Sequence, residues 1–251
     1  MSSTRVRALF FELFSGLPRQ GPGDSKSTGR AFRCVPELTP HDRILDIGCG
    51  TGAQTFVLAK RTRAKIVAVD NHVSYVEALN KRAAALSIAN RVVACVADMR
   101  QLEFENDSFD LIWCEGAIYN VGIETALREW RRFLRHKGFI AFTEVCWQKP
   151  NPPNECRLFW EHEYPAISTK KELLKVIESC GYQLIDHFPL DESAWWDEYY
   201  QPLQANLNAF RERYGDDLEA QNLCDQCQRE IDIWHAYGAF YGYEFVVIQA
   251  I

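Results

Sequence analysis

The segment Asp46-Ile-Gly-Cys-Gly-Thr-Gly52 joins a β-branched run to a helical one and holds the densest group of residues that could bind a ligand. Glycines at such a turn let the backbone approach a ligand closely, and the first amides of the helix face an electron-rich group. Gly48, Gly50 and Ala53 also match a dinucleotide fingerprint, so the glycines alone leave two classes of cofactor open. The segment predicts a cofactor-binding loop, with an ordinary strand–helix turn as the alternative.

Two acidic residues at strand ends bear on the choice of cofactor. Asp46 precedes the glycines, where a carboxylate would be repelled by a pyrophosphate but attracted by the cationic methionine moiety of S-adenosylmethionine. Asp70 ends the next predicted strand, eighteen residues after Gly52, and can accept hydrogen bonds from both hydroxyls of a ribose. The ribose role suits either cofactor, and a solvated acid without a role is the alternative for Asp70.

Two further strand ends carry candidate ligand contacts. Asp98 and Met99 follow the third predicted strand, where an acid and a thioether can hold an adenine ring; a helix N-cap is the alternative for Asp98. Glu115, Gly116 and Tyr119 follow the fourth strand. Because ligands of open parallel sheets lie at the carboxyl ends of the strands, Glu115 and Tyr119 are the candidate catalytic residues, with purely structural roles as the alternative.

Alternating strand and helix patterns are predicted to position these residues. Short β-branched or apolar runs predict strands at 43–48, 65–70, 91–98, 109–116 and 139–147. Amphipathic segments between them predict helices, the last of them from 123 to 138, where Gly138 would end it. This alternation indicates a parallel sheet covered on both faces. Downstream, a helix that begins with a capping box of Thr169 and Glu172 precedes predicted strands at 182–190 and 243–251.

The predicted organisation has three parts. Residues 1–41 form an N-terminal amphipathic helix and, at 19–30, a Gly- and Pro-rich loop that is either a lid over a ligand or a flexible connector. Residues 42–190 and 244–251 form the core. Residues 191–243 form a helical insertion that serves as a cap or a dimer contact. Its aromatic residues suit either a wall around a planar or cationic substrate or ordinary core packing. They are Trp195, Trp196, Tyr199, Tyr200, Trp234, Tyr237 and Tyr241.

Composition narrows the classes of function. The chain has 251 residues, is 47% hydrophobic and carries a formal net charge of -6, so it can build a core but has no basic surplus for a nucleic-acid partner. No apolar run approaches the roughly 20 residues of a membrane span. Nine scattered cysteines in apolar surroundings predict free thiols and a cytoplasmic location. Cys224 and Cys227 supply two ligands where a closed zinc site needs four, so no metal is predicted.

Several motifs together resemble those of class I S-adenosylmethionine-dependent methyltransferases. They are ILDIGCGTG, VAVD, VADM, FDLIWCEGAIY and LRHKGFIAFTE, and they cover about residues 42–147. Within that class the chain is similar to small-molecule methyltransferases of the ubiquinone/menaquinone-biosynthesis type and to bacterial methyltransferases of unassigned substrate. The resemblance implies an α/β fold: a Rossmann-like, doubly wound sheet of seven strands, mostly parallel, with a terminal antiparallel hairpin and a helical insertion before the last strand.

The resemblance also implies S-adenosylmethionine as methyl donor and a small molecule as acceptor. The methionine end would lie against Asp46, the glycines and Glu115, with the ribose at Asp70 and the adenine at Asp98. The implied cofactor-binding residues are Gln20, Asp46, Gly48, Gly50, Gly52, Asp70, Asn71, Asp98, Met99, Glu115 and Gly116. A non-catalytic S-adenosylmethionine-binding module and an NAD-dependent oxidoreductase are the alternatives, and a homodimer through the insertion is a possible assembly.

Overall fold

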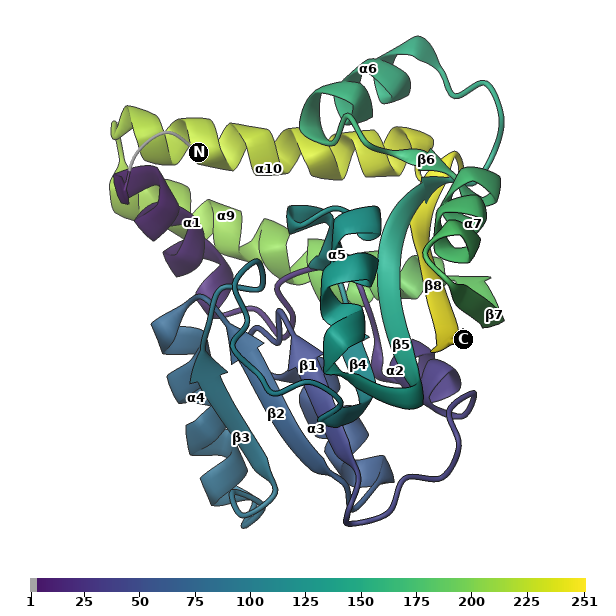
Figure 1. Cartoon of the computed structure of the whole chain (residues 1–251). Helices are drawn as coiled ribbons and strands as arrows, with labels where there is room; N and C mark the ends of the chain where they lie inside the picture. Colours follow the sequence, from purple (N-terminus) through teal and green to yellow (C-terminus); the bar gives the residue numbers. More distant parts are fainter. Residues whose placement is uncertain (1–3) are drawn as a thin grey trace.

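A single mixed sheet forms the centre of the computed structural model, which describes residues 4–251 (Figure 1). Its strands are β1 (Arg43–Ile47), β2 (Lys65–Asp70), β3 (Val92–Val96), β4 (Phe109–Cys114), β5 (Leu134–Trp147), β6 (Ser168–Thr169), β7 (Tyr182–Pro189) and β8 (Tyr241–Ala250). The order is β3-β2-β1-β4-β5-β8-β7, and the two-residue β6 pairs with β5. Pairing is parallel from β3 to β5, whereas β8 runs antiparallel to both of its neighbours. The predicted fold class is confirmed.

Helices cover both faces of this sheet. One face packs against α2 (Ser25–Phe32), α3 (Ala53–Arg61) and α4 (Val73–Ala85), and the other against α5 (Ile123–Trp130) and α7 (Lys170–Ser179). In β1, Ile44 and Leu45 are both fully buried but belong to the cores on opposite faces. Burial on both sides explains why the central strands are continuous apolar runs rather than alternating ones.

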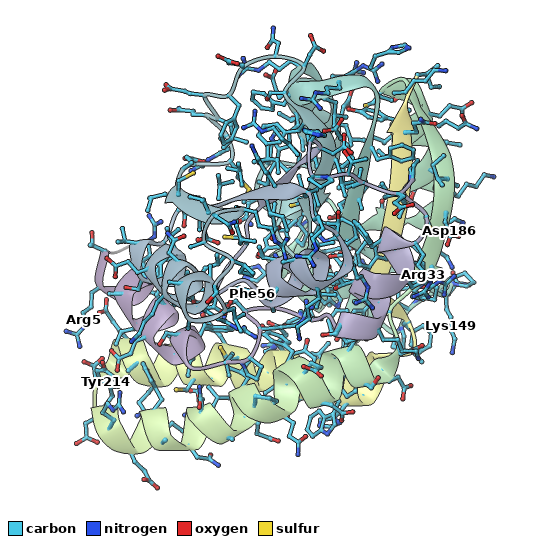
Figure 2. The ribbon with its side chains drawn as sticks, turned by 90° about the horizontal axis from the view of Figure 1, so that it is seen from below. Arg5, Arg33, Phe56, Lys149, Asp186 and Tyr214 are labelled. Carbon is cyan, nitrogen blue, oxygen red and sulfur yellow. The ribbon has the colours of Figure 1, made fainter. Side chains whose placement is uncertain are left out.

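A third core lies at one end of the sheet. It is built by α1 (Thr4–Ser15), α6 (Asn154–Glu163), α8 (Glu192–Trp195), the π-helical η3 (Trp196–Tyr200), α9 (Gln201–Tyr214) and α10 (Leu218–Tyr237). Figure 1 shows α9 and α10 lying across the end of the sheet, with α1 beside them. Arg5 and Tyr214 lie at the same end of this layer (Figure 2), where Arg5 pairs with Asp217 and the Tyr214 hydroxyl donates to Glu12 at 2.6 Å. The N-terminal helix and the insertion therefore form one layer, termed the cap.

The prediction of a loop at 19–30 is wrong for its second half. Residues 25–32 form α2, whose N-cap is Asp24; its carboxylate accepts from the Ser27 amide at 2.6 Å. Ser27, Thr28 and Ala31 are buried against the rest of the protein. Composition suggests a loop here because Gly, Ser and charged residues dominate, but the cap and the tertiary packing of one face stabilise a short helix.

The helix predicted for 123–138 is also too long. It ends at Trp130, and a 3₁₀ turn, η2 (Arg131–Phe133), leads into β5. Leu134 pairs with Phe109 of β4, and the register shifts between Phe109 and Leu111. The apolar spacing of this segment fits a helix, but pairing with β4 draws its second half into the sheet. The predicted helix end at Gly138 therefore lies inside a strand.

The predicted capping box of α7 is confirmed and gives a stability test. The Thr169 hydroxyl accepts from the Glu172 amide at 3.3 Å, and the Glu172 carboxylate accepts from the Thr169 amide at 2.8 Å. We expect Thr169→Ala to lower the free energy of unfolding by about 1 kcal/mol, measured by urea denaturation. Thr169→Ser keeps the hydroxyl and should retain most of that energy. Equal losses in both variants would mean that the cap contributes nothing.

No helix within residues 4–251 is both long enough and apolar enough to cross a membrane.

Candidate active site

A cavity of about 640 Å³ opens where β1, β2, β3 and β4 end, and its size suits a small-molecule ligand. Most of the sequence-predicted site residues line it: Gln20, Gly48, Gly50, Asp70, Asn71, Asp98, Met99, Glu115, Gly116 and Tyr119. Asp46 and Gly52 do not line it. The cap contributes Arg7, Phe10 and Phe11 of α1, which sequence reasoning did not place at the site.

The glycine loop is shaped by left-handed backbone conformations. Gly48 and Gly50 have φ of 71° and 53°. A Cβ at Gly48 would lie 2.4 Å from the Cβ of Ala117, and one at Gly50 would lie 2.5 Å from Oε1 of Gln20. Both glycines therefore allow other segments to close onto the loop, in a conformation that other residues rarely adopt. Gly52 instead serves the fold, since it precedes α3 with φ of 90° and a Cβ there would meet Leu79 at 2.8 Å.

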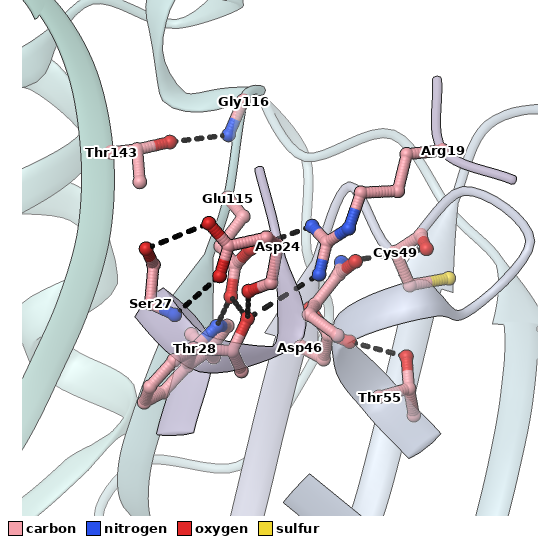
Figure 3. Close-up of polar contacts among 12 residues, drawn as sticks. Arg19, Asp24, Ser27, Thr28, Asp46, Cys49, Thr55, Glu115, Gly116 and Thr143 are labelled. Carbon is pink, nitrogen blue, oxygen red and sulfur yellow. Dashed lines mark hydrogen bonds and ion pairs between the residues drawn. The ribbon is translucent and has the colours of Figure 1, made fainter. Parts of the chain in front are cut away.

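Asp46 lies beneath the loop rather than in the cavity. Its carboxylate is fully buried and accepts from the Thr55 hydroxyl at 2.5 Å and from the Gln54 amide at 3.2 Å (Figure 3). The predicted direct contact with a cofactor therefore has no support in this geometry. Strand residues alternate between faces, and Asp46 points toward the first turn of α3. Gln54 lines the cavity and donates to Asp46, so it links the buried carboxyl to the cavity.

Burial raises the pKa of Asp46 to about 7, which predicts a dependence of stability on pH. The folded protein holds a proton that the unfolded chain, with an ordinary carboxyl pKa near 4, releases as the pH rises. The free energy of unfolding should therefore fall between about pH 4 and pH 7. Asp46→Asn cannot ionise, so we expect it to reduce this fall by an amount on the order of 2 kcal/mol.

Urea denaturation at pH 5 and pH 8 measures the effect in both proteins. Part of the decrease in unfolding free energy between the two pH values should remain in the variant, because burial also raises the pKa of Glu144 to about 7. The same change in unfolding free energy between the two pH values in wild type and variant would contradict the assignment to Asp46.

Asp70 is held as an acceptor at the end of β2. One carboxylate oxygen accepts from the Gly50 amide at 2.9 Å and the other from the His72 amide at 2.9 Å. Burial raises its pKa, and these backbone hydrogen bonds oppose the rise. Each oxygen keeps a second acceptor direction, so the carboxylate can take two ligand hydroxyls. Asn71 follows it along the cavity wall.

The far end of the cavity combines polar and aromatic groups. Asp98 forms an ion pair with Arg100 at 2.9 Å, and this hydrogen-bonded guanidinium lowers the pKa of the carboxyl. Phe11 of α1 stacks on His72, with ring centroids 3.7 Å apart and an angle of 4° between the planes. Tyr75 meets both rings edge-on. A planar group bound beside Met99 would thus face an aromatic wall that includes a residue from the cap.

Glu115 joins the N-terminal segment to β4. Its carboxylate pairs with Arg19 at 2.9 Å and accepts from the Thr28 hydroxyl at 2.7 Å and the Trp113 indole at 2.8 Å (Figure 3). The side chains of Arg19 and Glu115 are only 7% and 3% exposed. Both carboxylate oxygens are thus engaged within the protein, and the geometry favours a positioning role. The catalytic role of Glu115 stays a prediction.

Gln20, next to Arg19, lies over the glycine loop. Its carbonyl oxygen accepts from the amide of Thr51 at 3.0 Å and from its hydroxyl at 3.2 Å. Its amide donates to the backbone oxygen of Leu17 at 3.2 Å. The segment RQGPG is therefore held by two adjacent side chains, Gln20 on the glycine loop and Arg19 on Glu115, and sequence reasoning singled out only Gln20.

Tyr119 marks the end of the cavity that lies beyond Gly116. The Gly116 amide donates to the Thr143 hydroxyl at 2.8 Å, and a Cβ at Gly116 would lie 3.8 Å from the ring of Tyr243. Tyr119 is 43% exposed, and its ring meets Tyr164 edge-on at 6.0 Å. Partial burial raises the pKa of the Tyr119 hydroxyl above its ordinary value of 10.0, so the group stays protonated at neutral pH and can donate a hydrogen bond.

Cys224 and Cys227 are buried free thiols in α10, and all nine cysteines are free. Within residues 4–251 no group of three or more His, Cys, Asp or Glu side chains is arranged to hold a metal ion.

Comparison with known proteins identifies the family. A family model described as a methyltransferase domain matches residues 38–206. An uncharacterized methyltransferase of Bacillus subtilis, YodH, is 28% identical over 146 residues, which are 58% of this chain and 61% of that protein. The match thus spans less than two thirds of that relative's length.

Solved structures share the fold over nearly the whole chain. The Escherichia coli protein YjhP has a TM-score of 0.84 at 19% identity, with 97% of this chain and 99% of that chain covered. An S-adenosylmethionine-dependent methyltransferase of Geobacter sulfurreducens, solved with S-adenosylhomocysteine, has a TM-score of 0.82 at 20% identity, with 99% of both chains covered. Together with the family match over residues 38–206, the fold and the cavity at its strand ends show that this chain belongs to the methyltransferase domain family.

Proposed function

We propose that the protein transfers a methyl group from S-adenosylmethionine to a small-molecule acceptor and releases S-adenosylhomocysteine. The observation that carries the proposal is the carboxylate of Asp70. Two backbone amides fix it at the cavity, and its remaining acceptor directions suit the two hydroxyls of a ribose. Membership of the methyltransferase domain family supports the same conclusion.

The residues present fit S-adenosylmethionine along the length of the cavity. Asp70 and Asn71 would hold the ribose, Met99 and the ring of Phe11 would flank the adenine, and the glycine loop would face the methionine end. S-adenosylmethionine supplies a sulfonium methyl that the lone pair of an acceptor attacks. The protein contributes alignment and exclusion of water.

The N-terminal segment supplies much of that exclusion. Gln20 covers the glycine loop, and the buried pair of Arg19 and Glu115 ties the segment to the end of β4. Tyr119 and Gly116 then border the place where an acceptor would meet the methyl group. A cavity of this size beneath a helical cap supports a small acceptor over a macromolecular one.

Calorimetric titration of the purified protein with S-adenosylmethionine, S-adenosylhomocysteine and NADH tests the proposal. We expect binding of the first two at micromolar concentration and no binding of NADH. Binding of NADH alone would replace the methyl-transfer proposal with an oxidoreductase, and binding of none of the three would overturn it. An incubation with labelled S-adenosylmethionine and candidate acceptors then separates an enzyme from a binding module.

A further inference from the structure

Tyr119 lines the cavity beyond Gly116, and three further tyrosines from separate segments lie near it. These residues, termed the tyrosine cluster, are Tyr119 of η1, Tyr164 after α6, Tyr199 of η3 and Tyr243 of β8. Tyr119 contacts Tyr164, and Tyr243 approaches both Gly116 and the ring of Trp195, the latter at 5.0 Å between centroids. Tyr199 lies within electrostatic range of Tyr119 and Tyr243. Tyrosine rings therefore lie at the end of the cavity where an acceptor would bind.

Two carboxyl groups lie close to these rings. Glu144 of β5 is 3% exposed; it lies close to the Tyr164 hydroxyl, and its Oε2 has no hydrogen-bond partner among residues 4–251. Glu230 of α10 accepts from the Tyr200 hydroxyl at 2.8 Å. Both carboxyls lie within electrostatic range of Tyr119 and of Tyr243. Burial raises the pKa of each of them.

No positive charge of the described chain balances these carboxyls. Within residues 4–251 neither Glu144 nor Glu230 forms an ion pair. The arginines that line the cavity contact other groups, since Arg19 pairs with Glu115, Arg100 pairs with Asp98, and Arg7 lies over a phenylalanine ring. A buried carboxyl oxygen without a partner is costly unless a ligand supplies one.

We propose that the methyl acceptor is an amine that enters as its ammonium ion and binds against the tyrosine cluster, with Glu144 and Glu230 supplying the compensating negative charge. The ammonium then gives its proton to one of these carboxylates, and the freed nitrogen lone pair attacks the sulfonium methyl as S-adenosylhomocysteine leaves. The proposal rests on the proposed function and names its substrate class. The faces of tyrosine rings attract ammonium groups, and the attraction grows when water is excluded. The same carboxyls would repel a carboxylate or phosphate placed at this end. Tyr119, Tyr164 and Tyr243 keep accessible surface for such a contact, whereas Tyr199 is buried.

Three probes of one size but different charge test this recognition. They are choline, which is cationic, its neutral analogue 3,3-dimethylbutan-1-ol, and the anionic 3,3-dimethylbutanoate. Binding to the full chain saturated with S-adenosylhomocysteine is measured by ligand-observed NMR. We expect choline to bind at least about tenfold more tightly than the neutral analogue, and the anion to bind least. Equal or tighter binding of the neutral or anionic probe, or no binding of choline, would overturn the proposal.

Variants then assign the effect to the two carboxyls. Glu230→Gln and Glu144→Gln remove one negative charge each and should weaken choline binding by about tenfold while binding of the neutral analogue stays the same. Glu198→Gln removes an exposed carboxylate from the same cap and is the matched control, with no expected change. Wild-type affinity for choline in both Glu144→Gln and Glu230→Gln would contradict the proposal.

Binding of S-adenosylhomocysteine and binding of the three probes are separate measurements, so failure of the amine proposal can be distinguished from failure of the proposed function. If S-adenosylhomocysteine binds but the probes show no preference for positive charge, the methyl-transfer proposal stands and the amine is wrong. If S-adenosylhomocysteine does not bind, both proposals fall together.

Discussion

Replacing Asp70 with alanine should lower the affinity for S-adenosylhomocysteine by at least about a hundredfold. Each charge-assisted hydrogen bond from the carboxylate to a ribose hydroxyl contributes roughly 1.5–3 kcal/mol, and the proposed geometry has two of them. The variant also frees the amides of Gly50 and His72, which the carboxylate now holds. The glycine loop should therefore become less ordered in addition to losing its ligand contact. Calorimetric titration measures the affinity directly.

Asp70→Asn is the matched control for this prediction. The amide keeps one acceptor oxygen and the size of the side chain but loses the charge, so its affinity should lie between those of wild type and Asp70→Ala. Circular dichroism of each variant establishes that the fold is intact. Wild-type affinity in Asp70→Ala, with the fold intact, would remove the main support for the proposed cofactor site.

Replacing Glu115 with alanine should destabilise the protein by about 3–5 kcal/mol, because the change leaves the guanidinium of Arg19 buried without its partner. The carboxylate also satisfies Thr28 and the indole of Trp113. Loss of these contacts should release the segment from Leu17 to Asp24 from the end of β4. Urea denaturation gives the change in unfolding free energy, and limited proteolysis reports cleavage within the released segment.

A double variant that removes both charges of the Arg19–Glu115 pair shows how much of the lost stability comes from an unpaired arginine. The double variant Arg19→Met with Glu115→Gln leaves no unpaired charge, and its glutamine can still accept from Thr28 and Trp113. It should therefore be more stable than Glu115→Ala, as expected when the cost comes from an uncompensated buried ion. A double variant that is less stable than the single one would place the energy in direct packing contacts instead.

The positions of the ligand-facing residues could be predicted because each follows a strand whose pattern is visible in the adjacent residues of the sequence. RILDIG and KIVAVD each carry the pattern of a buried strand, and parallel strands that alternate with helices bring their carboxyl ends to one edge. Asp70, Asp98 and Gly116 follow three such strands and line one cavity. The capping box of α7 is similarly local, since its partners are three positions apart.

Contacts between distant segments could not be predicted in this way. Arg19 and Glu115 are 96 positions apart, and nothing in RQGPG distinguishes an arginine that becomes buried from one that stays in solvent. Phe11 belongs to an amphipathic helix whose partner the sequence does not identify. For Asp46, the strand pattern locates the residue, but the direction of its side chain depends on the hydrogen bonds of Thr55 and Gln54.

The place of β8 between β5 and β7 has a consequence for the protein as it leaves the ribosome. Both neighbours are synthesised first, and the far edge of β5 stays without its long partner until residues 241–250 emerge. Open strand edges of this kind are sites where nascent chains pair wrongly or aggregate. The hairpin of α9 and α10 emerges just before β8 and packs with it, so the cap and this half of the sheet can be completed only after the last strand has emerged. A chaperone that binds extended apolar segments would have its longest opportunity during this interval.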